Sequence, residues 1–153
     1  MDIGFAPDEI DTAAPTRAAR LKWVVVVDGS LPAGRIANAT ACVGAATGDA
    51  VAGLLGPDAV DAHGSAHAGL PWIGCTVLTA DAAQLATIRE KAAASDEVFV
   101  ADMPAHAQLT RVYDECLAEV SGRPSEDLGY LAVGLVGPRN RVDRIVGRLP
   151  LLA

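Results

Sequence analysis

The chain has 153 residues, a net charge of −7 and an apolar fraction of 51%, which suits one domain with a buried core and excludes disorder over most of its length. Its 19 acidic residues outnumber its 12 lysines and arginines. Because binding to a nucleic-acid backbone requires clustered lysine and arginine, we do not expect a nucleic-acid partner.

The first 20 residues are polar, and we interpret them as an N-terminal arm that Phe5 and Ile10 attach to the rest of the chain. Residues 21–153 are then expected to form a single α/β domain. Residues 23–27 are continuously apolar and mostly β-branched, which predicts a strand covered on both faces.

Residues 34–47 place apolar or threonine side chains at helical spacing between alanines and glycines, and predict a helix that approaches its neighbours closely. Residues 49–71 are irregular and rich in glycine, with a possible hairpin over 60–67. The remaining predicted elements are a strand over 73–78, a helix opened by a capping box at Asp81 and Gln84, a strand over 98–101, a helix from Ala105 to Gly122, a strand over 130–136 and a short helix capped by Asn140. Alternating strands and helices indicate a layered α/β domain.

Cysteine usage and apolar run length bear on the cellular compartment. Cys42, Cys75 and Cys116 are odd in number and widely spaced, a pattern typical of reduced thiols in a cytosol. We find no charged-then-apolar leader, and no apolar run reaches about 18 residues. We therefore expect a cytoplasmic protein that does not contact a membrane.

Lys22 abuts the buried strand and Arg35 stands at the start of the next helix, where the backbone dipole favours anions. If the two side chains converge, they can hold a phosphate, a carboxylate or a developing oxyanion. The competing interpretation of Lys22 is a solvated charge at a strand end.

Three other histidine, cysteine and glycine patterns favour no further site. His63 and His67 lie in a glycine-rich loop without a third ligand nearby, so we expect no metal ion. Cys42 has no histidine close in sequence to activate it, and packing is its expected role. Gly44, Gly48, Gly53 and Gly56 fall at the end of a helix and not at its start, so we expect no dinucleotide cofactor.

Residues 22–27 (KWVVVV) and 34–37 (GRIA) resemble the opening of the type 2 peptidyl-tRNA hydrolases, and residues 133–151 resemble that superfamily's closing strand, Gly-Pro turn, helix and Val-x-Gly-x-Leu-x-Leu tail. Residues 20–28, 56–58 and 137–141 resemble the bacterial family catalogued as domain of unknown function 2000, which is regarded as sharing this fold.

The resemblance implies a three-layer α-β-α fold with a four-stranded mixed β-sheet, commonly assembled as a homodimer. It also implies that Lys22 matches the active-site lysine of the hydrolases and that Arg35 replaces a lysine at the helix start. Three departures weaken a hydrolase site: Asp28 replaces an arginine, Cys42 replaces a histidine, and residues 103–110 hold no aspartate in the matching place.

The leading hypothesis is therefore a hydrolase-like fold with a remodelled pocket that binds a small polar or anionic ligand, or a partner, without tRNA hydrolysis. The expected pocket residues are Lys22, Asp28, Arg35, Asn38 and Gln108.

The alternative is a hydrolase of ester or amide bonds, in which Lys22 stabilises the oxyanion and Asp102 or His106 orients water. His106 also has a simpler interpretation as a solvated side chain at a helix start. A third possibility is a structural dimerisation module with an apolar surface and no cleft.

Overall fold

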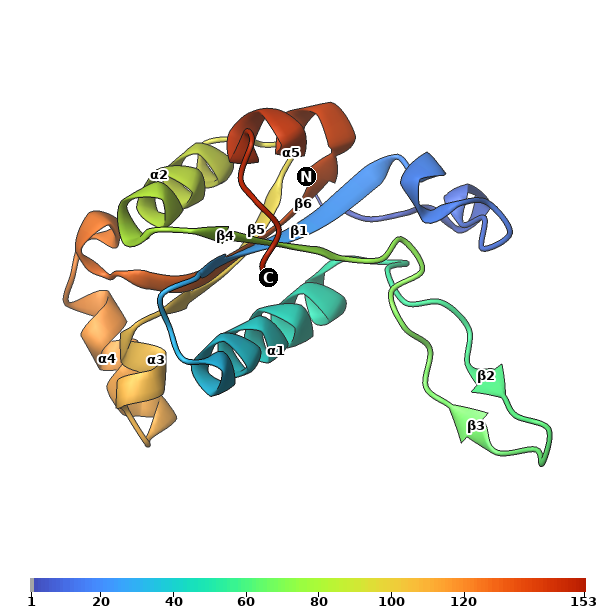
Figure 1. Ribbon diagram of the computed structural model, residues 1–153, viewed down its shortest axis with the longest axis horizontal. Coiled ribbons are helices and arrows are strands. Elements are labelled where there is room, and N and C mark those ends of the chain that lie inside the picture. The colour runs from blue at the N-terminus through green and yellow to red at the C-terminus, as the bar shows by residue number, and fades with distance from the viewer. Residues whose placement is uncertain (1) are drawn as a thin grey trace.

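The computed structural model describes residues 2–153 and is built on a four-stranded sheet with strand order β4-β1-β6-β5 (Figure 1). The strands are β1 (Leu21–Asp28), β4 (Thr76–Ala80), β5 (Phe99–Pro104) and β6 (Tyr130–Pro138). Strand β1 runs parallel to β4, whereas β6 runs antiparallel to both β1 and β5. The sheet is therefore mixed, as expected.

Helices cover both faces of the sheet (Figure 1). They are α1 (Ala33–Ala50), α2 (Ala82–Ala93), α3 (His106–Leu109), α4 (Tyr113–Ser121) and α5 (Arg139–Val146). Val25 and Val27 of β1 pack in the cluster that includes α1, whereas Val24 and Val26 pack in the cluster that includes α2 and α5. Successive strand side chains point to opposite faces, so this run of valines fills both core layers.

Helix α1 packs directly onto β6 at Gly134, which has no side chain to hold the helix away. A Cβ atom added at Gly134 would lie 2.5 Å from Cγ1 of Val43 and 3.8 Å from Oγ1 of Thr47. Val43 and Thr47 are both buried, and Thr47 donates its hydroxyl proton to the Val43 carbonyl. The predicted close approach of this small-residue helix is thus realised at one position of the central sheet.

We expect Gly134→Ala to lower the free energy of unfolding by about 1–3 kcal/mol, because the new methyl group overpacks the interface between α1 and β6. Gly48→Ala is the matched control, since nothing lies within 4 Å of its added Cβ and α1 gains helix propensity there. Urea denaturation measures both variants. A Gly134→Ala protein as stable as the parent would show that α1 can move away freely.

Three details differ from the sequence expectations. The single helix predicted from Ala105 to Gly122 is wrong: the chain breaks between α3 and α4, where Val112 adopts extended backbone angles. The apolar stripe of that helix is therefore not buried as a unit, and Leu109 is 71% exposed. The residue that precedes α5 is Pro138 and not Asn140, which lies inside the helix.

The chain near its carboxyl end pairs with the outer edge of β4. Leu151 bridges Leu78, the Thr79 amide donates to the Pro150 carbonyl, and the Leu152 amide donates to the Val77 carbonyl. This pairing covers an edge strand that would otherwise present free backbone groups. No helix within residues 2–153 is both long and apolar enough to cross a membrane.

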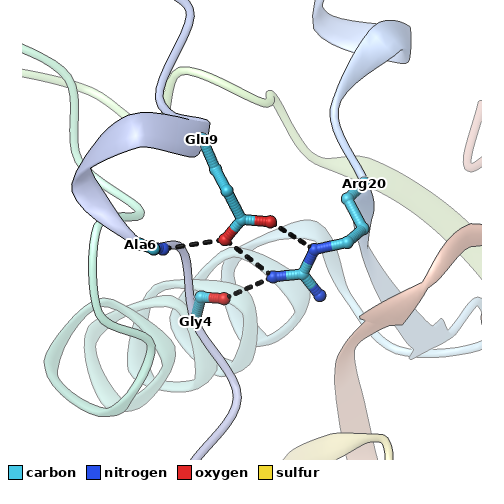
Figure 2. Close-up of polar contacts among 4 residues, drawn as sticks. All are labelled: Gly4, Ala6, Glu9 and Arg20. Atoms are coloured by element: carbon cyan, nitrogen blue, oxygen red, sulfur yellow. Dashed lines mark hydrogen bonds and ion pairs between the residues drawn. The ribbon is translucent and has the colours of Figure 1, made fainter.

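The segment before β1 is fastened by an ion pair between Glu9 and Arg20 (Figure 2). Arg20 Nε lies 2.6 Å from Oε1 of Glu9, and Arg20 also donates to the Gly4 carbonyl at 2.9 Å. Phe5 is buried, and its ring lies 4.8 Å from that of Trp72. Arg20 and the amide of Ala6 lower the pKa of Glu9 to about 2.

The folded state lowers the pKa of Glu9 from 4.5 to about 2. The contribution of Glu9 to the stability of the fold is therefore fully present above pH 4.5 and is lost as the pH falls through about 2. We expect the hydrogen-exchange protection factor of the Phe5 amide, which bonds to the Ala52 carbonyl, to fall over this range. At neutral pH, Arg20→Gln should lower the protection factor of the Phe5 amide, whereas the control Arg17→Gln should leave it unchanged. Equal protection in both variants would contradict the role given to the ion pair.

Candidate functional site

Three strands point their carboxyl ends toward one edge of the sheet. Strand β4 is parallel to β1, and β5 has the same direction because both β1 and β5 are antiparallel to β6. The segments that follow β1 and β5, namely the start of α1 and helix α3, therefore lie at this edge. In open α/β sheets, ligands bind beyond the carboxyl ends of the strands.

At this edge, Gln108 of α3 joins two residues of α1. Its Oε1 accepts a hydrogen bond from Arg35 Nε at 2.7 Å. Its Nε2 donates to the Arg35 carbonyl at 3.0 Å and to Asn38 Oδ1 at 3.1 Å. Both polar atoms of the Gln108 amide are thus engaged, and the three predicted residues form one cluster.

The cluster leaves several donors unused. Within residues 2–153, neither Nη atom of Arg35 donates a hydrogen bond, and the Asn38 amide nitrogen donates none. Pro32, which precedes α1, supplies no side-chain cap, so the first amides of the helix also lack a side-chain acceptor. A depression of about 460 Å³ adjoins these groups; its lining residues are Gly34, Arg35, Asn38, Ala107, Gln108 and Leu109.

Asp28 lies at the end of β1, in the approach to α1, and its carboxylate has a local structural role. One oxygen accepts from the Ser30 amide at 2.9 Å and from the Ser30 hydroxyl at 2.6 Å. These bonds stabilise the tight turn that leads into the helix. The residues that line the depression beside Arg35 do not include Asp28.

Lys22 does not share a hollow with Arg35. It stands at the amino end of β1, six residues or ~20 Å along the strand from Asp28. It also projects to the face that carries α5, where its Nζ lies 2.6 Å from Oδ1 of Asp143. The predicted convergence of Lys22 and Arg35 is therefore wrong, because strand direction and strand face both separate them.

The residues of the hydrolase alternative are likewise dispersed. Lys22 pairs with Gly137 of β6 and Asp102 pairs with Val133, a separation of four residues or ~13 Å along that strand. Asp102 accepts a hydrogen bond from Arg89 of α2 at 3.1 Å.

His106 of α3 lies against α4. Its Nε2 is 3.7 Å from Oε2 of Glu119, and its Nδ1 is buried with no hydrogen-bond partner among the described residues. Among the described residues, its ring thus forms no hydrogen bond or ion pair with Asp102, and it does not line the depression beside Arg35. In residues 2–153, no three His, Cys, Asp or Glu side chains are placed to hold a metal ion.

A second depression, of about 630 Å³, lies between α2 and the chain that precedes β6. Its cation is Arg89, which is already paired with Asp102, donates to the Ser125 hydroxyl and lies over the Tyr130 ring at 5.9 Å. Burial raises the pKa of Tyr130, so this phenol stays protonated near neutral pH. Because Asp102 already neutralises Arg89, less positive charge is available to a ligand in this depression than beside Arg35.

Sequence reasoning missed the partners that decide these roles. Asp143 neutralises Lys22 from a position 121 residues away, and no local pattern signals that pairing. Arg35 is held by the neutral amide of Gln108, an arrangement that we call the clamp, and these two residues are 73 positions apart. Gln108 itself was found because the resemblance placed it in the segment after the third predicted strand.

The sequence profile described as "Protein of unknown function (DUF2000)" matches residues 21–153. The chain belongs to the DUF2000 family. The segment before β1 lies outside this match, whereas the cluster around Arg35 and the hairpin strands β2 (Ala59–Val60) and β3 (Ala66–His67) lie inside it.

The DUF2000 chain is similar in structure to a solved protein titled as a protein of unknown function, Atu0240, from Agrobacterium tumefaciens strain C58. The two share 20% sequence identity with a TM-score of 0.76, over 88% of this chain and 98% of that one. At this identity the likeness shows a common fold. No curated protein sequence matches the chain.

Proposed function

We propose that this DUF2000 protein binds a small ligand bearing a carboxylate or phosphate group at the cluster of Arg35, Asn38 and Gln108. We further propose that its fold is a remodelled form of the type 2 peptidyl-tRNA hydrolase fold that does not hydrolyse peptidyl-tRNA. The observation that carries the binding proposal is the clamp on Arg35, which holds the side chain without neutralising it.

The clamp favours binding for an entropic reason. A long arginine side chain normally loses rotamer freedom when it binds an anion. Gln108 holds Nε in place already and leaves both Nη atoms available, so part of that cost is met in the free protein. A guanidinium presented in this way suits the two oxygens of a carboxylate or phosphate.

The start of α1 adds to the attraction. Arg35 is the third residue of an 18-residue helix, whose amino end carries a partial positive charge from aligned peptide dipoles. The backbone amides there have no side-chain cap, and Gly34 has nothing within 4 Å of where a Cβ would stand. An anion can thus reach the helix end and Arg35 together.

The argument against peptidyl-tRNA hydrolysis rests on charge and distance. Lys22, which matches the active-site lysine, is paired with Asp143 and stands at the opposite edge of the sheet from Gln108. A net charge of −7 opposes binding to a long phosphate backbone. These features support ligand binding over the hydrolase alternative.

We also propose that the protein acts in the cytoplasm. Cys42, Cys75 and Cys116 form no disulfide bond with one another within the described chain. Unpaired thiols are typical of a reducing compartment.

We expect inorganic phosphate, or a small dicarboxylate in a panel, to bind the parent protein in a calorimetric titration. Arg35→Gln should weaken that binding by about tenfold or more, since it removes the charge of the site. Gln108→Ala should weaken it less, because the charge stays and only its restraint is lost. Arg148→Gln, at an exposed arginine that follows the end of α5, is the control. Binding that is equal in Arg35→Gln and the parent would refute the site.

We expect no release of peptide from peptidyl-tRNA by the parent protein above the background rate. The measurement compares the parent with Lys22→Ala, using a known hydrolase as positive control. Turnover by the parent that Lys22→Ala abolishes would favour the enzyme hypothesis over the one proposed.

A further inference from the structure

Helix α1 borders a further depression, of about 600 Å³, which we call the groove. Its lining residues are Ala33, Ile36, Ala37, Thr40, Ala41, Val77, Leu152 and Ala153. The groove therefore follows the first half of α1, and its other wall comes from β4 and from the carboxyl-terminal residues, which cross β4 (Figure 1). Thr40 is the one polar side chain among these residues, and its hydroxyl already donates to the Ile36 carbonyl.

The groove is open because α1 carries small side chains on this side. Ala33, Ala37 and Ala41 are exposed, and each ends in a single methyl group. Ile36 and Val77 are partly buried and pack against the core cluster beneath α1. The groove thus presents apolar atoms to water, and such a surface gains free energy when another apolar group covers it.

The groove and the anion site are neighbours on the surface of α1. Gly34 and Asn38 line the depression beside Arg35, whereas Ala37 and Ala41 line the groove. Gly34 and Ala37 are three residues apart, as are Asn38 and Ala41, and residues at this spacing lie ~5–6 Å apart on a helix surface. Nothing lies within 4 Å of where a Gly34 Cβ would stand. At this point the boundary between the two depressions is therefore formed by a glycine and a methyl group.

We propose that one amphipathic ligand occupies both depressions, with its carboxylate or phosphate at Arg35 and an unbranched apolar chain in the groove. This inference rests on the anion site proposed above and names the class of its ligand, a fatty acid or an alkyl phosphate. The groove extends ~12 Å along α1 from Ala33 to Ala41, which suits a chain of medium length.

The two ends of such a ligand contribute through different physical effects. An ion pair with the exposed Arg35 is weakened by water and by salt, so the charged group alone binds weakly. Each methylene group that enters the groove adds affinity in proportion to the apolar area removed from water. The groove therefore supplies affinity, whereas Arg35 selects an anionic group and sets the orientation of the ligand.

The source of this ligand is a dissolved amphiphile and not a membrane. Anionic membranes attract clusters of lysine and arginine. Arg35 is the one basic residue of α1, no other lysine or arginine follows before Arg89, and the net charge of the chain is −7. A single cation does not hold an acidic protein on a bilayer, but it is sufficient to pair with one dissolved anion.

Calorimetric titrations with inorganic phosphate, butyl phosphate and octyl phosphate, all below the concentrations at which they form micelles, test the chain requirement. Octyl phosphate should bind at least about tenfold more tightly than butyl phosphate, because its longer chain buries more methylene groups. Octanol has the chain without the charge, and it should bind at least about tenfold more weakly than octyl phosphate. Arg35→Gln should weaken octyl phosphate by a similar factor.

A polar side chain in the groove tests where the chain lies. Ala41→Gln should weaken octyl phosphate by about tenfold and leave inorganic phosphate unchanged, because the new amide fills the groove without changing the charge of the site. Ala45→Gln is the matched control, since Ala45 is an exposed residue of the same helix that lines neither depression. It should change neither affinity. Circular dichroism checks that both variants fold.

The possible results separate this inference from the proposal on which it rests. Phosphate binding that requires Arg35, together with equal affinities for butyl and octyl phosphate, would overturn the amphipathic ligand and leave the anion site in place. A parent protein that binds neither phosphate nor either ester would overturn both. Octyl phosphate binding that Arg35→Gln or Ala41→Gln leaves unchanged would also overturn the inference. So would sedimentation of the protein with vesicles of phosphatidylglycerol and phosphatidylcholine, which would assign the surface to a membrane.

Discussion

Helix α1 must lie close to the sheet, and the other features depend on where it is held. Its buried side is narrow, with Ala39, Val43 and Thr47 as its fully buried residues, and Gly134 leaves the space that lets them approach β6. Because α1 is held in this position on the sheet, its first turn lies within hydrogen-bond distance of Gln108 on α3. This position also leaves exposed alanines of α1 beside β4, where they line a depression of about 600 Å³ that a bulkier helix would fill.

The ion pairs show why Arg35 differs from several other cations of the protein. Lys22, Arg89 and Arg141 each lie within 3.1 Å of a carboxylate, so their charges serve to join elements of the fold. Arg35 is also fixed, but by the neutral amide of Gln108. A neutral partner restrains a side chain and leaves its charge uncompensated, which is the arrangement that a binding site for an anion requires.

The hairpin between α1 and β4 (residues 55–71) and the anion site are ordered in different ways. The anion site is made by side chains of two helices that the sheet brings together, and it needs no second chain. The hairpin is ordered by hydrogen bonds to backbone and carboxylate groups within itself, yet Val60 and Leu70 stay exposed to water. Apolar side chains on a projection gain free energy only when another surface covers them.

The amino-acid sequence is enough to predict the strands of the main sheet, the order of the main elements and the layered α/β class. The valines of β1, the capping box at Asp81 and the glycine-punctuated hairpin are local patterns, and local patterns report burial and turns. Strand directions, and the face to which each side chain points, are set by pairing between distant segments, so they become known only from the three-dimensional fold. For this reason the sequence pointed to Lys22 and Arg35 as possible neighbours. In the folded protein, Lys22 pairs with Asp143 at one edge of the sheet, and Arg35 bonds to Gln108 at the opposite edge. These partners are 121 and 73 residues apart, so the local spacing of residues cannot predict them.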